Sequence, residues 1–156
     1  MSNSTKEKLQ FLLHRGLEFE KKFEFISVWK GFVAVNSTNR KTVLALARDS
    51  HEHRLKLENL LEKLDLEAPT NEIPDVTFDF DGMLDAEILQ KIIEQDEMVL
   101  DFYTELAEKT DPKLVVALSG EKNGDFFYQT LKRIVKDEKR HVRRVKALTG
   151  NITRIL

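Results

Sequence analysis

The stretch FYQTLKRIVKDEKRHVRRVKAL, from Phe127 to Leu148, decides the fold. Its apolar residues recur at intervals of three and four, which predicts a helix with one apolar face. Glu138 and His141 are in phase with that face, so a carboxylate and an imidazole are expected inside a helical core. A charge buried in a core is costly unless something compensates it. The stretch therefore predicts a core helix that carries groups able to bind a cation.

The composition agrees with a helical protein. Charged residues make up 33% of the 156 residues and hydrophobic ones 41%, with only 6 Gly and 3 Pro, a profile typical of helix-rich globular proteins. The length predicts one domain that spans residues 1–156. The chain has no Cys, which excludes disulfides, thiolate catalysis, and iron–sulfur or thiolate–zinc sites. Any bound metal must therefore use His and carboxylate ligands.

The charge pattern and the N-terminus bear on partners and location. The formal net charge is −2, and the basic run from Lys132 to Lys146 alternates with acidic and apolar positions. We interpret this run as a solvated helix face rather than a nucleic-acid site. No apolar run reaches the roughly 18 residues of a membrane span, and the N-terminus lacks the apolar core of a signal peptide. We expect a soluble cytoplasmic protein without nucleic-acid or membrane partners.

Four long stretches without an internal proline have helical periodicity, and they cover about residues 5–35, 38–64, 85–109 and 125–149. The polar cluster at 36–39 predicts a very short loop between the first two. Asp85 is the expected N-cap of the third helix, and Gly150 is the expected stop after the fourth. Residues 114–118 are expected to form a short apolar turn.

Segment 66–83 is long for a loop inside a compact bundle, and it contains Pro69, Pro74 and Gly82. It is long enough to cross from one end of the helices to the other. Two short-loop hairpins joined by one long crossover form the ferritin-like arrangement of a four-helix bundle. The predicted fold is therefore all-α, a ferritin-like four-helix bundle with two antiparallel hairpins joined by one long crossover.

The inward face of each predicted helix carries a residue type that binds metal. Residues three apart lie on one helical face, so Glu138 and His141 can converge on one ion. Each of the other three helices also has a carboxylate or an imidazole in phase with its apolar residues. The preferred metal ligands are Glu20, His53, Asp96, Glu138 and His141.

Neighbouring residues remain open as alternative ligands: Glu24 on the first helix, Asp49 on the second and Glu97 on the third. Any one of these polar residues could instead be a hydrogen-bonded core side chain. A ligand type within the apolar face of all four helices favours a metal site. Iron, manganese and zinc accept carboxylate and imidazole ligands together. The candidate cofactors are therefore iron, manganese and zinc, and no metal remains the other alternative.

Two stretches resemble the rubrerythrin-type branch of the ferritin-like superfamily, and the resemblance covers nearly the whole chain. KDEKRH at 136–141 resembles the second Glu-x-x-His helix of that branch. IEQDEMVLDFY at 93–103 resembles its third helix, where a ligand carboxylate precedes a Phe-Tyr pair. The family binds two metal ions through one Glu from each of two helices and a Glu-x-x-His from each of the other two. The resemblance implies that five of these six positions are occupied by Glu20, His53, Asp96, Glu138 and His141.

The sixth position departs from the family. Aligning residues 49–53 with 137–141 puts Ser50 where the family has a Glu, and Asp96 is shorter than the usual Glu. The resemblance implies that the missing Glu bridges two ions, so the second ion would be held less firmly unless Asp49 rotates inward. The open outcomes are an altered two-ion centre, a bundle without metal, or a single ion bound by Asp96, Glu138 and His141.

The resemblance also implies a function. The first hypothesis is a non-haem iron or manganese protein that acts on dioxygen, peroxide or ferrous iron. Such a protein is a di-iron-type oxidoreductase with ferroxidase or peroxidase-like activity, whose partner is a small inorganic oxidant or a metal ion. Tyr103 is expected nearby as a hydrogen-bond donor or radical trap. The chain lacks the four-cysteine electron-transfer module of fuller rubrerythrins, which disfavours a self-contained peroxidase.

Two other functions remain open. One is a non-enzymatic helical bundle that has lost its metal site and serves a structural or interaction role. The other is a DNA-protecting mini-ferritin, which predicts a large shell. Apolar residues outside the inward faces favour a homodimer, namely Phe11, Phe25 and Trp29.

Overall fold

A computed structural model of the chain describes residues 3–24, 37–69 and 82–155, and these residues form helices and connecting turns without any strand. The all-α class is therefore confirmed for the described part of the chain. None of the described helices combines the length and the apolar character needed to cross a membrane. The helices are α1 (Asn3–Glu24), α2 (Ser37–Lys63), α3 (Asp85–Lys109), α4 (Pro112–Ser119) and α5 (Glu121–Ile155).

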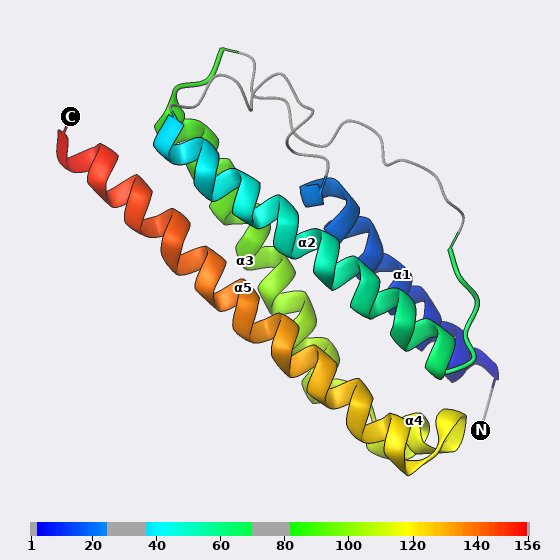
Figure 1. Cartoon of the computed structure of the whole chain (residues 1–156). Coiled ribbons are helices and arrows are strands. Elements are labelled where there is room, and N and C mark those ends of the chain that lie inside the picture. Colours follow the sequence, from blue (N-terminus) through cyan, green and yellow to red (C-terminus); the bar gives the residue numbers. More distant parts are fainter. Residues whose placement is uncertain (1–2, 25–36, 70–81, 156) are drawn as a thin grey trace.

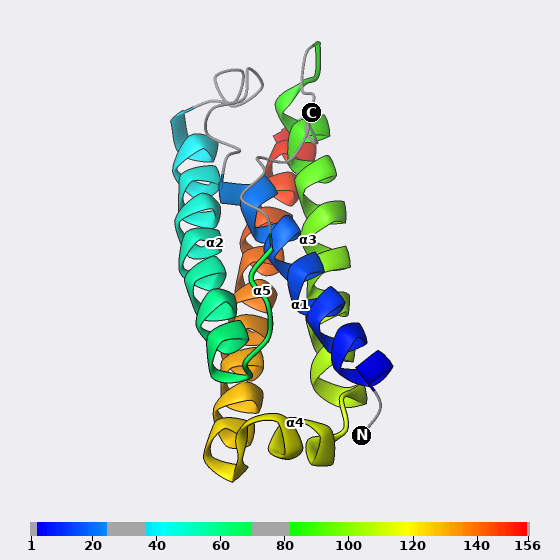
Figure 2. The same cartoon turned by 90° about the vertical axis from the view of Figure 1, so that its right-hand side faces the viewer.

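The four long helices lie side by side as a bundle, and the short α4 crosses one end of it (Figures 1 and 2). Helix α1 packs on α2, and α3 packs on α5, with further contacts between α2 and α5 and between α1 and α3. The two helices of each pair run in opposite directions, whereas α2 and α3 run in the same direction (Figure 1). The chain between α2 and α3 therefore connects opposite ends of the bundle. Most of that connection, residues 70–81, lies outside the described residues.

The core consists of apolar residues on the inward faces of the helices. Each long helix contributes at least one residue with no exposed surface, and burying a side chain of this size contributes about 1.5–3 kcal/mol. Hydrophobic burial therefore holds the four helices together along their length. Examples are Leu13 on α1, Leu57 on α2, Ile92 on α3 and Leu131 on α5.

The predicted helix bounds are close for two helices and wrong for another. Helix α3 has the predicted bounds, and α2 differs by one residue at each end. The prediction for α5 is wrong at both ends, because the helix begins at Glu121 and continues past Gly150 to Ile155. A single glycine costs a helix about 1 kcal/mol, so it does not have to end one. In the first predicted helix, residues 25–35 lie outside the described part of the chain.

Two local predictions at helix starts are also corrected. Asp85 is the first residue of α3 rather than its N-cap, which is Leu84 in extended conformation. An acidic residue in the first turn still stabilises the helix dipole. The expected apolar turn at 114–118 is part of helix α4, because Asp111 caps this helix by accepting a hydrogen bond from the Lys113 amide. Proline in the first turn of α4 has no amide hydrogen to leave unpaired there.

The apolar residues proposed for a dimer contact are only partly described. Phe11 on α1 is 66% exposed, as expected for a residue outside the inward face. Phe25 and Trp29 lie outside the described residues. The homodimer therefore stays a prediction.

Leu57 and Leu55 offer a matched test of the core. Leu57 is fully buried, whereas Leu55, two residues away on the same helix, is 44% exposed. We expect Leu57→Ala to lower the free energy of unfolding by about 2–5 kcal/mol, because it removes buried surface and leaves a cavity. Leu55→Ala should change it by less than about 0.5 kcal/mol. Urea unfolding followed by circular dichroism measures both, and equal effects would contradict the described packing.

Candidate metal centre

Five side chains selected from the sequence lie together in the core, and none is more than 2% exposed. One ligand atom from each of Glu20, His53 and Glu138 lies within 4.8 Å of the others, and the same holds for Asp96, Glu138 and His141. Glu138 belongs to both groups. The geometry is therefore two adjacent ligand sets that share one carboxylate. We call these five residues the buried centre.

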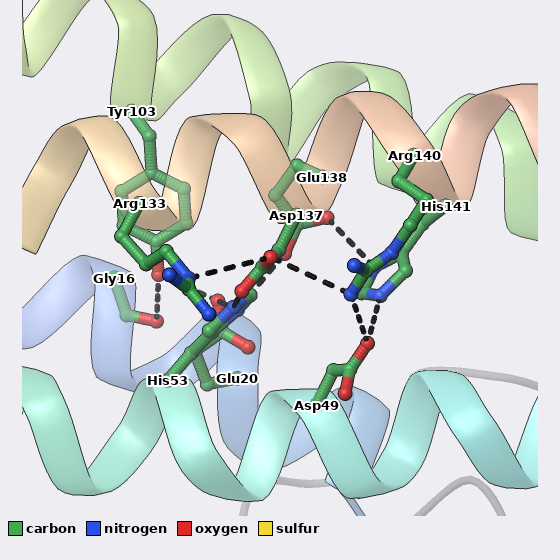
Figure 3. A network of polar contacts seen from close by, with 10 residues as sticks. All are labelled: Gly16, Glu20, Asp49, His53, Tyr103, Arg133, Asp137, Glu138, Arg140 and His141. Atoms are coloured by element: carbon green, nitrogen blue, oxygen red, sulfur yellow. Dashed lines mark hydrogen bonds and ion pairs between the residues drawn. The ribbon is translucent and has the colours of Figure 1, made fainter.

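Both imidazole rings turn the same nitrogen toward Glu138 (Figure 3). Nδ1 of His53 lies 3.2 Å from Glu138 Oε1 and 3.6 Å from Glu20 Oε1. Nδ1 of His141 lies 3.5 Å from Glu138 Oε2. The ring centroids are 6.3 Å apart. Nδ1 is therefore the nitrogen that each ring offers to a ligand between them.

The other nitrogen of each ring donates to an aspartate on the opposite helix. His53 Nε2 on α2 donates to Asp137 Oδ2 on α5 at 2.9 Å, and His141 Nε2 on α5 donates to Asp49 Oδ2 on α2 at 2.5 Å. A carboxylate acceptor keeps the hydrogen on Nε2, so the lone pair of a neutral ring is on Nδ1. These two bonds orient both rings so that Nδ1 faces the centre.

The sequence reasoning missed Asp137 and considered Asp49 only as a substitute ligand. Asp49 is bonded to His141 and also accepts a hydrogen bond from Arg140 Nη2 at 3.3 Å, so the structure places it outside both ligand sets. The signal for both aspartates is in the alignment of residues 49–53 with 137–141, where each Asp precedes its His by four residues. The sequence does not show that each Asp contacts the His of the other helix.

Tyr103 on α3 lies next to the centre, as the sequence predicted. Its hydroxyl donates to Glu20 Oε1 at 2.7 Å and lies 3.3 Å from the Gly16 carbonyl oxygen. A side chain at Gly16 would crowd this ring, because an added Cβ would lie 3.3 Å from the Tyr103 hydroxyl oxygen. Glycine at this position therefore lets Tyr103 reach Glu20 across the α1–α3 interface.

Four buried atoms of the centre have no hydrogen-bond partner among the described residues: Glu20 Oε2, His53 Nδ1, Asp96 Oδ2 and Glu138 Oε2. An unsatisfied buried polar atom costs about 1–3 kcal/mol. The four atoms come from four different helices, and all are oxygen or imidazole nitrogen. Divalent iron, manganese and zinc bind this combination of atoms. The residues therefore fit a metal ion.

The carboxyl groups of the centre differ in their protonation. Burial raises the pKa of Asp96 well above its usual value, and the nearby charge of Glu138 raises it further. Burial also raises the pKa of Glu20. Burial acts in the same direction on Glu138, but its contacts with His141 and His53 outweigh that effect and lower its pKa to about 2. Glu138 is thus the carboxylate that keeps its charge most firmly.

The histidines respond to the same carboxylates. Burial lowers the pKa of His53, but its contacts with Glu138 and Glu20 outweigh burial and raise the pKa to about 11. The pKa of His141 is also raised, because contacts with Glu138 and Asp49 outweigh its burial. The raised pKa values of both histidines favour protonated rings in the metal-free protein, and protons and metal ions compete for such ligands.

The remaining alternative ligands lie outside the buried centre. Glu97 is half-buried and forms an ion pair with Lys146 at 2.8 Å. Glu24, at the end of α1, accepts hydrogen bonds from Arg54 Nε at 2.6 Å and is 2.6 Å from His51 Nδ1. Both carboxylates therefore have partners of their own near the surface.

The chain has no match among protein-family models, curated proteins or solved structures. The chemistry of the buried centre is therefore inferred from its own residues and their arrangement.

Tyr103→Phe tests the hydrogen bond that holds Glu20. Removing the hydroxyl leaves Glu20 Oε1 without its donor in a fully buried position, so we expect the metal-free protein to lose about 1–3 kcal/mol of unfolding free energy. Tyr128→Phe is the control, because its hydroxyl donates to the backbone oxygen of Thr110 in a partly buried position. Urea unfolding in the presence of chelator compares the two. A smaller loss for Tyr103→Phe than for the control would contradict this role.

Glu24 gives a pH test. Burial alone would raise its pKa, but the hydrogen bonds from Arg54 and His51 outweigh burial and lower the pKa below 4.5. A depressed pKa contributes stability above the unfolded value that is lost as the pH falls through the folded value. Glu24→Gln should therefore be less stable than the parent at pH 7, by about 1 kcal/mol.

The difference should shrink as the pH falls from about 4.5 through the lower pKa of folded Glu24, where the parent carboxylate also becomes neutral. Urea unfolding midpoints between pH 7 and pH 3 measure the difference. Glu18→Gln is the control, because Glu18 is paired with Arg15 on an exposed surface, where ion pairs contribute little. A constant difference for Glu24→Gln over the whole range would refute this account.

Proposed function

We propose that this chain is a ferritin-like, rubrerythrin-type bundle that binds iron or manganese in the buried centre and acts on dioxygen, peroxide or ferrous iron. The observation that carries the proposal is the set of four buried atoms without a hydrogen-bond partner, contributed by four helices. Two of them, His53 Nδ1 and Glu138 Oε2, have only ion-pair contacts at 3.2 to 3.6 Å. Leaving these atoms unpaired would cost several kcal/mol. A bound cation would contact these atoms and remove that cost.

The order of the helices supports the ferritin-like part of the proposal. Two antiparallel pairs, α1 with α2 and α3 with α5, are linked by a connection between opposite ends of the bundle. A four-helix bundle with one long crossover is the ferritin-like arrangement. The bundle delivers one carboxylate from α1, one from α3, and a Glu-x-x-His from α5.

The choice of metal follows from the donor atoms. Three carboxylates and two imidazoles form a mostly hard set without sulfur, which suits iron and manganese, whereas zinc more often takes a smaller tetrahedral set. Bound iron or manganese would supply the exchange of electrons with a small inorganic oxidant. The chain supplies the rest: Asp49 and Asp137 orient the two rings, Tyr103 holds Glu20, and the apolar core limits access of water.

A specific observation favours a second candidate, a bundle that has lost its metal and serves a structural role. Ser50, 3% exposed on α2, provides no carboxylate at the position that corresponds to Glu138 on α5. The contacts of His53 and His141 with Glu138 also compensate part of the buried charge without a cation. In this alternative the polar groups serve to specify one packing of the helices.

Metal content separates the two candidates. The untagged protein, purified without chelator, should contain iron or manganese at one ion per chain or more, as measured by mass spectrometry of the metals. Glu138→Ala should reduce this content to background, because Glu138 belongs to both ligand sets, and His141→Ala should lower it by the ion of the one set to which His141 belongs. Glu97→Ala is the control and should retain the metal, because Glu97 pairs with Lys146 away from the centre.

The oxidation of ferrous iron in air, followed by absorbance, tests the activity itself. The parent and Glu97→Ala should accelerate it over buffer, and Glu138→Ala should not. If the parent contains only background metal, and neither Glu138→Ala nor His141→Ala changes that content, the structural bundle is the function. Metal binding without acceleration would restrict the proposal to a binding protein.

A further inference from the structure

The buried centre has an approximate two-fold relation between α2 and α5. His53 on α2 donates to Asp137 on α5, and His141 on α5 donates to Asp49 on α2. In each helix the Asp precedes the His by four residues. The two bonds are therefore equivalent under an exchange of the two helices (Figure 3).

The same exchange relates Ser50 to Glu138. Each follows its Asp by one residue and precedes its His by three, and both are buried, at 3% and 2% exposure. Glu138 lies against both imidazole rings. Its counterpart is a hydroxyl, which has no charge and is shorter than a Glu side chain. The centre therefore lacks one carboxylate on the α2 side.

The missing carboxylate leaves the charge of a two-ion centre unbalanced. One divalent ion with two ionised carboxylates and a neutral imidazole is electrically neutral, and either ligand set provides these groups. The second ion adds two positive charges, but only one carboxylate remains unshared. One positive charge is left uncompensated in a buried site, where such a charge is costly.

The neighbouring aspartates do not remove this imbalance. Asp49 and Asp137 each accept a hydrogen bond from an imidazole. Two arginines balance their two charges, because Arg140 pairs with both aspartates at 3.3 and 3.4 Å and Arg133 pairs with Asp137 at 4.0 Å. Their charges are thus already engaged outside the two ligand sets. The missing negative charge has to come from solution.

We propose that a small monocarboxylate binds at the Ser50 side of the buried centre and that the second metal ion binds tightly only together with it. This inference rests on the proposed metal function. The carboxylate supplies the charge and the oxygen atoms that a Glu at position 50 would supply, and the Ser50 hydroxyl is a hydrogen-bond donor on that side. Asp49, whose side chain is 27% exposed against 12% for Asp137, is the more exposed of the two aspartates and gives a small anion its approach on the Ser50 side.

The test titrates Co²⁺ into the metal-free full-length protein in a sulfonate buffer, with and without formate. The visible absorption of Co²⁺ and metal analysis after gel filtration give the number of ions bound. Without formate we expect one tightly bound ion per chain. With formate we expect two, and an affinity for the second ion that is higher by about tenfold, within the usual range for two coupled ligands.

Variants at position 50 show whether that position is responsible. Ser50→Glu should bind two ions without formate and show no effect of formate, because it supplies the missing carboxylate. Ser50→Asp is the second variant with the same expectation, in case the longer side chain prevents folding, which circular dichroism will show. Ser50→Ala should keep the formate effect. Gln129→Glu adds a carboxylate to an exposed position of α5 and should behave like the parent.

The possible results separate this inference from the proposed function. Two ions bound equally tightly without formate would overturn the inference. A formate effect that persists in folded Ser50→Glu or Ser50→Asp would also overturn it. Binding of one ion under all conditions would overturn the inference but leave the metal function in place. A parent that binds no Co²⁺ would overturn both.

Discussion

The rest of the centre depends on one interaction, between the charged carboxylate of Glu138 and the two imidazole rings that face it. Burial opposes the ionisation of Glu138, yet its contacts with His141 and His53 lower its pKa to about 2. Glu138 in turn raises the pKa of both rings and of Asp96. Removing this one carboxylate would change the protonation of every other group in the centre. The four-helix packing serves to hold these groups within reach of one another.

The bundle combines two opposing requirements. Its apolar faces provide the burial that stabilises the fold, as Leu13, Leu57, Ile92 and Leu131 illustrate. The same packing removes water from five ionisable side chains, which is unfavourable for each of them alone. Hydrogen bonds with Asp137, Asp49 and Tyr103, which lie outside the centre, reduce this cost for His53, His141 and Glu20, while Glu20 Oε2 and His53 Nδ1 keep no hydrogen-bond partner. Such an arrangement lowers the stability of the metal-free protein, which is consistent with the proposed cation site.

Much of this could be predicted from the sequence because helices repeat regularly. A period near 3.6 residues assigns each side chain to a face, so Glu20, His53, Asp96, Glu138 and His141 could be placed in the core without coordinates. Helix ends were less predictable. Gly150 does not stop α5, because its cost is small against a long helix. The apolar residues at 114–118 fold into α4 because Asp111 and Pro112 start a helix there.

The sequence alone determined the class of fold, the inward faces and the residues that carry ligand atoms, because these depend on local periodicity and side-chain chemistry. Only the tertiary structure decided which of these residues meet. The pairing of Asp49 with His141 and of Asp137 with His53 joins residues about 90 positions apart. The separation of Glu24 and Glu97 from the centre likewise depends on partners on other helices. Contacts between helices follow from their rotation and relative height in the bundle, which no single helix encodes.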